Sequence, residues 1–169
     1  MANNINLQSA IKDIQTEKLD IETFVKNVNY QGDRDDILVS IRQRLVDNAY
    51  VDERSICCAM LREFNDKESL PLIWRLIADE STKGKRGSLV YAMENMNPIA
   101  HLEQLIELVV NDNFEVLCNA MNTIDNLNGS VDENIIENCC QKISVALTMP
   151  MPTWRKEALS LLLEEFDDE

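Results

Sequence analysis

One short pattern recurs four times along this chain, and it constrains the fold more than any other feature of the sequence. In each copy a small alanine is followed directly by a long apolar residue, as in "YAMENM", which begins at Tyr91. The alanines are Ala59, Ala92, Ala120 and Ala158, and the residues that follow them are Met60, Met93, Met121 and Leu159. Successive alanines are 33, 28 and 38 residues apart, which leaves room for two helices and two short turns in each interval. Self-similarity at this period is typical of helical repeat proteins.

The apolar residues around these positions recur at spacings of three and four, which predicts amphipathic helices. The predicted helical segments are 33–48, 52–64, 66–80, 81–96, 101–114, 113–129, 130–149 and 153–166, preceded by two shorter helices near 5–17 and 19–29. Asn97 and Pro98 are expected to begin one of these helices, and Gly129 to end another. Aromatic residues make up only 5% of the chain, which disfavours a strand-rich fold. We therefore predict an all-α fold.

A chain of 169 residues has the length of a single domain. We expect one all-helical domain over residues 1–169, with N-terminal helices in residues 1–30 and the repeats in residues 35–169. The segment "NYQGD" at 29–33 is the expected break between them. The recurring alanine has a physical role, because stacked helix pairs need one close contact in each repeat. The long residue after it would fill the space between the layers.

The helix-pair period, the short turns and the alanine in the second helix resemble HEAT repeats. The resemblance covers about residues 35–169 and is carried best by "LPLIWRLIADESTKGKR", where Pro71, Asp79 and Arg86 match the Pro, Asp and Arg of the HEAT pattern. The repeat around "NDNFEVLCNA" lacks the Arg, and the last repeat has a proline-rich turn instead. The resemblance implies a short right-handed α-solenoid of antiparallel helix pairs. The alternative is an irregular α-helical bundle in which the four copies are coincidence.

Residues that usually carry catalysis or bind metals are sparse, so we expect no enzymatic activity, no cofactor and no metal. The single histidine, His101, lies at the beginning of a predicted helix, where a surface or capping role is expected. No CxxC or HExxH motif is present, and "KGKRG" at 83–87 lacks the spacing of a phosphate loop. Glu103 and Glu107 are the nearest approach to a carboxylate pair, but they are ordinary helix neighbours at i and i+4.

The cysteines and the N-terminal segment indicate a cytoplasmic protein. Four of the five cysteines form the adjacent pairs Cys57–Cys58 and Cys139–Cys140, which do not resemble a disulfide framework. The N-terminal segment has no basic region followed by an apolar run, as a signal peptide would have. No stretch of the sequence approaches the roughly 18 apolar residues of a membrane span.

Charge is the most unusual bulk property of the chain. There are 30 acidic and 16 basic residues, which gives a formal net charge of −14 and a pI near 4.4. Such a protein repels nucleic acid and anionic lipid, and it attracts basic proteins. From Gly87 to Gln141 there are nine acidic residues and no Lys or Arg. Two interpretations stay open: the acidic surface provides solubility, or it binds a basic partner.

The repeat predicts which polar residues face the same side. Because second helices of a solenoid line its concave face, we expect one polar, acidic stripe across these helices. It consists of Tyr91, Glu94, Glu115, Asn119, Asn122, Asn126, Glu157, Ser160 and Glu164. We call these residues the predicted stripe. Tyr91 would be its aromatic anchor, since tyrosine is enriched at interface hot spots. Trp74 and Trp154 are expected between helices instead.

These features favour protein binding. Small, acidic, single-domain proteins without catalytic motifs resemble bacterial immunity proteins of contact-dependent growth inhibition systems. That resemblance implies a basic toxin C-terminal domain as the partner, most simply a nuclease, whose active site must be cationic to hold phosphates. Direct binding would occlude that active site, with no nucleic acid, membrane or metal involved. The alternative is a general HEAT-repeat adaptor or scaffold without toxin specificity.

Overall fold

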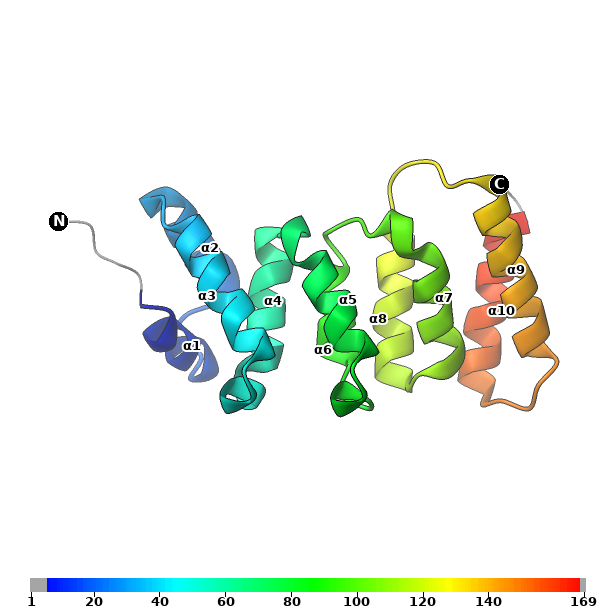
Figure 1. Ribbon diagram of the computed structural model, residues 1–169, viewed down its shortest axis with the longest axis horizontal. Coiled ribbons are helices and arrows are strands. Elements are labelled where there is room, and N and C mark those ends of the chain that lie inside the picture. The colour runs from blue at the N-terminus through cyan, green and yellow to red at the C-terminus, as the bar shows by residue number, and fades with distance from the viewer. Residues whose placement is uncertain (1–5, 168–169) are drawn as a thin grey trace.

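The computed structural model describes residues 6–167, and every regular element in that range is helical. The prediction of an all-α fold is therefore confirmed for the described part of the chain. Figure 1 shows the helices following one another along the long axis of the molecule, with α1 near one end and α9 and α10 at the other. Within residues 6–167, no helix is both long enough and apolar enough to cross a membrane.

The α-helices have the bounds Leu7–Gln15 (α1), Ile21–Gln31 (α2), Arg34–Val46 (α3), Arg54–Phe64 (α4), Leu70–Ala78 (α5), Gly87–Met93 (α6), Leu102–Asn111 (α7), Phe114–Asp125 (α8), Glu133–Leu147 (α9) and Thr153–Asp167 (α10). Short 3-10 helices lie between some of them, at Asn48–Glu53 (η1), Lys67–Ser69 (η2), Glu80–Thr82 (η3) and Ile99–His101 (η4). Each predicted helical segment overlaps one of these α-helices, and most of the differences lie at the ends. Helix α2 continues to Gln31, through the first part of the expected break at 29–33, and is ended by Gly32, whose φ of +81° is left-handed.

The helices pack in a regular order. Helix α3 packs on α4, α5 on α6, α7 on α8 and α9 on α10, so that sequence neighbours form pairs. The second members of the first three pairs also contact one another, α4 against α6 and α6 against α8. The last junction differs, because α9 packs on α7 there, with smaller contacts of α10 on α7 and α8. The apolar faces of all these helices meet in one continuous core. Burial of those faces is the main force that holds such short helices in place.

Each recurring alanine lies on the second helix of a pair, on α4, α6, α8 and α10. Ala92 and Ala120 are fully buried in the α4–α6–α8 contacts, while Ala59 and Ala158 are half-buried. Met60, Met93 and Leu159, which follow three of the alanines, are fully buried as well. The small side chain therefore permits close approach of helices in the middle of the molecule, and the long side chain beside it fills the core.

Hydrogen bonds between successive pairs repeat with nearly the same sequence separation. Five pairs of residues at separations of 31 to 33 are joined by side-chain hydrogen bonds: Arg62–Glu94, Arg62–Asn95, Gly87–Asn119, Glu94–Asn126 and Asn97–Asn128. These separations match the mean alanine spacing in the sequence. The sequence period is thus also the period at which neighbouring pairs are joined.

One buried ion pair fixes the N-terminal pairs relative to one another. Arg42 on α3 reaches Asp66, which follows α4 and is 3% exposed, with an Nη2–Oδ1 distance of 2.6 Å and an Nε–Oδ2 distance of 2.9 Å. The Ser69 hydroxyl donates to Asp66 Oδ2 at 2.5 Å. Because every polar atom of this cluster that is buried has a partner, the cluster joins α3 to the start of α5 without an unsatisfied charge.

Helix α6 is shorter than the predicted segment 81–96, and its first turn starts six residues later. Local hydrogen bonds compete with helix formation here. The Asp79 side chain accepts the Ser81 N–H at 2.8 Å, and the Thr82 hydroxyl donates to the Leu76 carbonyl at 2.6 Å. Gly84 then adopts φ +78°, a left-handed conformation that ends any helical run. The basic segment around it is therefore a loop.

The prediction that Asn97 caps a helix is wrong. Asn97 has φ +52° and lies outside the helix, and α7 begins only at Leu102. Its side chain instead holds the loop between α8 and α9: Nδ2 donates to the Asn128 carbonyl at 2.8 Å and Oδ1 accepts the Asn128 N–H at 2.9 Å. Gly129 lies in that loop with φ +126°, after α8 has already ended at Asp125.

Candidate protein-binding surface

The structure brings together the six residues of the predicted stripe that lie on or beside α6 and α8. Tyr91 belongs to α6 and Glu94 follows its last residue. Glu115, Asn119 and Asn122 belong to α8, and Asn126 is its C-terminal cap. Since α6 packs on α8, these residues share one region of the surface. Glu115, Asn122 and Asn126 are exposed, whereas Tyr91, Glu94 and Asn119 are half-buried.

Hydrogen bonds set the register of these two helices. The Asn119 amide Nδ2 donates to the Gly87 carbonyl at 3.0 Å, at the first turn of α6. Asn126 Nδ2 donates to the Asn122 carbonyl at 2.8 Å and lies 3.5 Å from Glu94 Oε1. The Glu115 side chain lies directly against Gly87, where a Cβ would collide with it. Part of the predicted stripe is thus committed to holding α6 and α8 together.

Arg62 belongs to this surface and was not predicted. From α4, its Nε donates to Glu94 Oε2 at 2.7 Å, and its guanidinium carbon lies 4.7 Å from the centre of the Tyr91 ring. The hydrogen bond to Glu94 raises the pKa of Arg62 above its usual value. The guanidinium group of Arg62, from the preceding repeat, therefore covers part of both Tyr91 and Glu94. The available signal was the spacing, because Arg62 precedes Glu94 by about one repeat period.

The three residues on α10 lie apart from the others. Glu157 and Glu164 are exposed and Ser160 is half-buried. Helix α10 meets α8 at its N-terminal end, where the Phe114 and Trp154 rings pack edge to face with centres 5.2 Å apart. In the part of the chain that the structure describes, no hydrogen bond or ion pair joins these three residues to the stripe on α6 and α8.

The segment 87–141 has no basic residue, but basic residues from outside it reach into it. Arg62 pairs with Glu94 at 2.7 Å, Arg86 with Asp112 at 3.0 Å and Lys142 with Glu107 at 2.9 Å. Arg155 also donates to the Asp112 carbonyl. Among residues 6–167, no ion pair includes the other six acidic residues of the segment, which are Glu103, Glu115, Asp125, Asp132, Glu133 and Glu137.

Several of those six stabilise helix starts. Asp132 is the N-terminal cap of α9 and accepts the Asn134 N–H at 2.9 Å, and hydrogen bonds from the Asn134 side chain and backbone lower the Asp132 pKa. Glu103, Glu115 and Glu133 lie in the first turns of α7, α8 and α9, where the helix dipole favours a negative charge. Asp125 is different, because it lies in the last turn of α8.

The residues considered for catalysis are engaged in packing or pairing. Glu107 contacts Lys142 and accepts from Asn111 Nδ2 at 2.5 Å. His101 is half-buried with its ring centre 5.0 Å from that of Trp74. Burial raises the pKa of the Cys58 thiol to about 12, which keeps it protonated at neutral pH. Within residues 6–167, no group of three or more His, Cys, Asp or Glu side chains is placed to hold a metal ion.

Comparisons with known proteins found no match to this chain. No protein-family model matches the chain, and no curated protein or solved structure matches it significantly.

Proposed function

We propose that this chain is a protein-binding module, and specifically an immunity protein that neutralises a basic toxin domain by covering its active site. The toxin domain would be a nuclease of a contact-dependent growth inhibition system. The proposal includes a right-handed solenoid of HEAT-like helix pairs, a cytoplasmic location and the absence of enzymatic activity.

One observation carries the proposal, which is the excess of acidic over basic residues in the second half of the chain. Residues 87–169 contain fifteen acidic and three basic residues, a formal charge of −12. The helices of this region need no such excess in order to pack, since their contacts are apolar. Like charges at this density cost stability by repulsion. A basic partner would turn the same charges into attraction and would accelerate encounter.

The arrangement of the acids suits a protein partner in particular. Glu115, Glu157 and Glu164 are exposed on α8 and α10, helices that pack against their neighbours. Such a surface meets a folded cationic domain at several points without reorganising. For a nuclease, the cationic points are those that hold phosphates, so covering them excludes the substrate.

The test is a pull-down from the native host with the tagged protein, at low salt, followed by elution in a salt gradient. The proposal expects one basic protein with a toxin domain to be retained, and the isolated domain to lose its activity when this chain is added. The variant E115Q/E157Q/E164Q removes three exposed carboxylates, so its complex should elute at lower salt.

The matched control is E17Q/D52N/E80Q, which removes the same charge from exposed positions in the N-terminal half. Its complex should elute where the unaltered protein's complex does. Equal elution of both variants would mean that net charge alone sets retention, and that the predicted stripe has no specific role. Retention of several unrelated proteins would overturn the immunity proposal and favour a general scaffold.

A further inference from the structure

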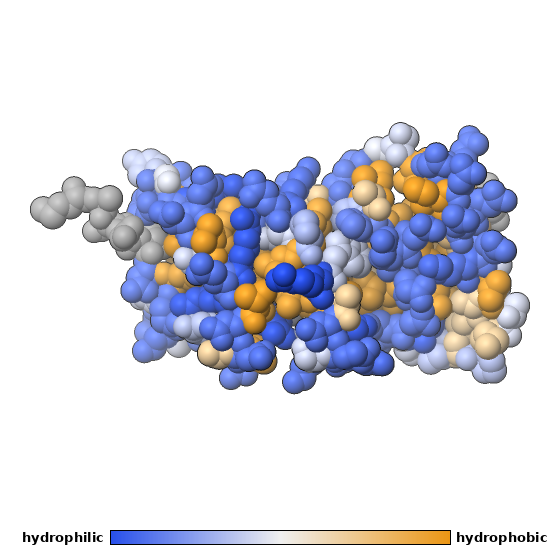
Figure 2. All heavy atoms as spheres, in the orientation of Figure 1, coloured by the Kyte–Doolittle hydropathy of each residue, from blue (hydrophilic) through white to orange (hydrophobic). Residues whose placement is uncertain are grey.

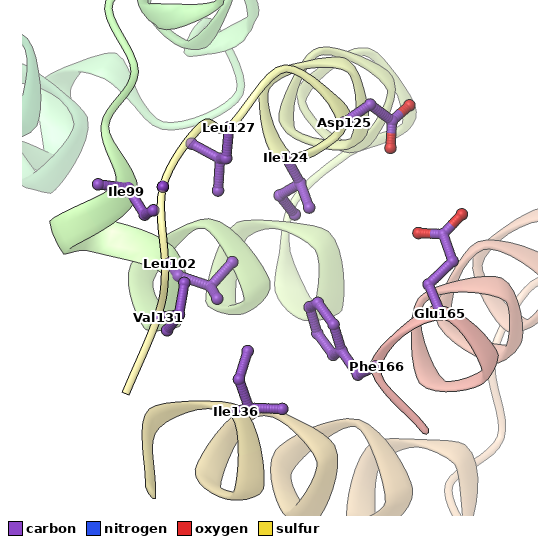
Figure 3. A pocket seen from close by; sticks show the side chains of 10 residues that line it. Ile99, Leu102, Ile124, Asp125, Leu127, Val131, Ile136, Glu165 and Phe166 are labelled. Atoms are coloured by element: carbon purple, nitrogen blue, oxygen red, sulfur yellow. The ribbon is translucent and has the colours of Figure 1, made fainter. Parts of the chain in front are cut away.

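A cavity of about 570 Å³ lies at the junction of the last two helix pairs. We call it the junction cavity, and Figure 3 shows its lining. Seven of the ten lining residues have apolar side chains. The lining comes from η4, the first turn of α7, the C-terminal end of α8, the loop that follows it, the start of α9 and the end of α10. The apolar residues are Ile99, Leu102, Ile124, Leu127, Val131, Ile136 and Phe166.

Two carboxylates complete the lining. Asp125 lies in the last turn of α8, and Glu165 lies near the end of α10. Figure 3 shows the two side chains pointing toward one another across the opening, while Phe166 points into the cavity. Both carboxylates are exposed, and no lining residue is basic. In the described part of the chain, no ion pair includes either of them.

This placement of charge is unfavourable in the free protein. Each carboxylate is at the C-terminal end of its helix, where the helix dipole is negative and a cation is preferred. The two carboxylates also repel one another. An occupant with a positive charge at the opening would relieve both effects, and an apolar group below it would cover the exposed apolar lining.

We propose that the junction cavity receives one bulky apolar side chain of a basic protein partner, with a Lys or Arg next to it in the partner's sequence contacting Asp125 and Glu165. This inference rests on the proposed function and names the partner's contact chemistry. The seven apolar side chains of the lining favour an apolar anchor over an inserted Lys or Arg. An inserted Lys or Arg would place its charge deepest, among apolar side chains, and leave its stem between the carboxylates.

The probes are three peptides with blocked ends. The first has a phenylalanine between two pairs of basic residues, Lys-Arg-Phe-Arg-Lys. The second has glycine in place of phenylalanine, and the third has glutamate in place of each basic residue. Binding is measured by chemical-shift changes in NMR spectra of the isotope-labelled protein. We expect only the first peptide to shift the resonances of Leu127, Val131, Ile136 and Phe166.

Two protein variants test the site. D125N/E165Q removes both carboxylates and should weaken binding of the first peptide by roughly fivefold. The matched control D52N/E17Q removes the same charge far away in the sequence and should change binding by less than about twofold. V131W fills the cavity from a loop position, where a larger residue is tolerated best, and should abolish the shifts at Phe166 while the far-UV spectrum stays helical.

Equal binding of the first and second peptides, or equal weakening by the two charge variants, would overturn the inference. Binding of phenethylamine at the cavity without binding of the first peptide would also overturn it, since the occupant would then be a small amine. The pull-down separates this inference from the proposed function. If a toxin is retained equally by V131W, only the inference fails, and if the first peptide binds but no toxin is retained, only the proposed function fails.

Discussion

The two halves of this molecule share one packing scheme but differ sharply in charge. Residues 1–86 contain thirteen of the sixteen basic residues and fifteen of the thirty acidic ones, a formal charge of −2, against −12 for residues 87–169. In the first half, Arg42 pairs with Asp66, Arg44 with Glu53 and Lys26 with Glu22. In the second half, most exposed acids have no basic residue near them in the sequence.

The comparison distinguishes the apolar packing that stabilises the fold from the charges on its surface. Both halves bury apolar helix faces in the same continuous core, whatever their surface charge. Figure 2 shows apolar residues emerging between the helices on the face in view, in both halves. The charge difference is therefore a property of the surface, and changes to packing and changes to charge should act separately.

The largest expected effect comes from breaking the buried pair of the first half. Asp66→Ala leaves Arg42 without its main partner in a half-buried site, which should lower the free energy of unfolding by about 3 kcal/mol. Chemical denaturation measures it. Glu68→Ala is the control, because Glu68 is 83% exposed and its contact with Arg42 is 3.2 Å, so the loss should stay under about 0.5 kcal/mol. Equal losses of stability in the two variants would show that the buried partner Asp66 stabilises the fold no more than the exposed partner Glu68.

Overpacking the helix contacts should cost almost as much. Ala92→Leu forces a larger side chain into the fully buried α6 contacts and should lower the free energy of unfolding by about 2 kcal/mol. Ala158→Leu, at the half-buried equivalent on α10, should cost less than about 1 kcal/mol. If the two losses were the same, the recurring alanine would not mark close helix approach.

Removing the ion pair at the boundary of the two halves should have an intermediate effect. Arg62→Ala leaves Glu94 unpaired and uncovers the Tyr91 ring, so stability should fall by about 1 kcal/mol, measured by thermal and chemical denaturation. Arg75→Ala, an exposed site on α5, provides the control and should change stability little. The Arg62 variant should also bind a basic partner more tightly, because it frees Glu94.

Alkaline pH should destabilise the protein through its buried thiols. Burial raises the pKa of Cys57 to about 11 and that of Cys58 to about 12. The neutral thiol is the form favoured by folding, so the stability it provides is complete below the unfolded pKa near 9 and is lost as pH rises through these values. Cys58→Ala should reduce the loss between pH 9 and pH 10 by about 1 kcal/mol. An unchanged pH profile would contradict the assignment.

The smallest predicted effect is the change in stability with salt, which should come mainly from the second half. Raising NaCl from about 0.05 to 0.5 M screens the repulsion among the acids of residues 87–169 and should stabilise the protein by about 0.5 kcal/mol. In E115Q/E157Q/E164Q this gain should shrink, whereas in E17Q/D52N/E80Q it should persist. Thermal denaturation at both salt concentrations measures each gain. A gain that shrinks equally in both variants would show that the repulsion is not concentrated in the second half.

The sequence predicted the helices well because their apolar spacing is strong, and the recurrence of alanine located Ala92 and Ala120 in the core. The prediction failed at residues 81–86, since hydrogen bonds of Asp79 and Thr82 outcompete the helix there. The prediction also missed the ion pairs of the segment 87–141. Arg62, Arg86 and Lys142 lie outside this segment in the sequence, but they pair with acidic residues inside it.

The candidate surface could be predicted only in part. The register of α6 and α8 follows from the repeat, so Glu94 and Asn126 were placed together correctly. The junction cavity depends on the loop between α8 and α9, which the Asn97–Asn128 hydrogen bonds hold in place. This loop has no repeated counterpart elsewhere in the sequence, so the repeat could not predict the junction cavity.

The separation of 31 to 33 residues between hydrogen-bonded side chains has a consequence for folding kinetics. Within residues 6–167, the side-chain hydrogen bond whose partners are farthest apart in the sequence, from Gln8 to Glu53, spans only 45 residues. Ordering each pair therefore requires closing only a short loop onto a neighbour, which corresponds to low contact order and fast folding. Amide hydrogen exchange should then be fastest in α1 and α10, which have a neighbouring pair on one side only, and slowest in α6.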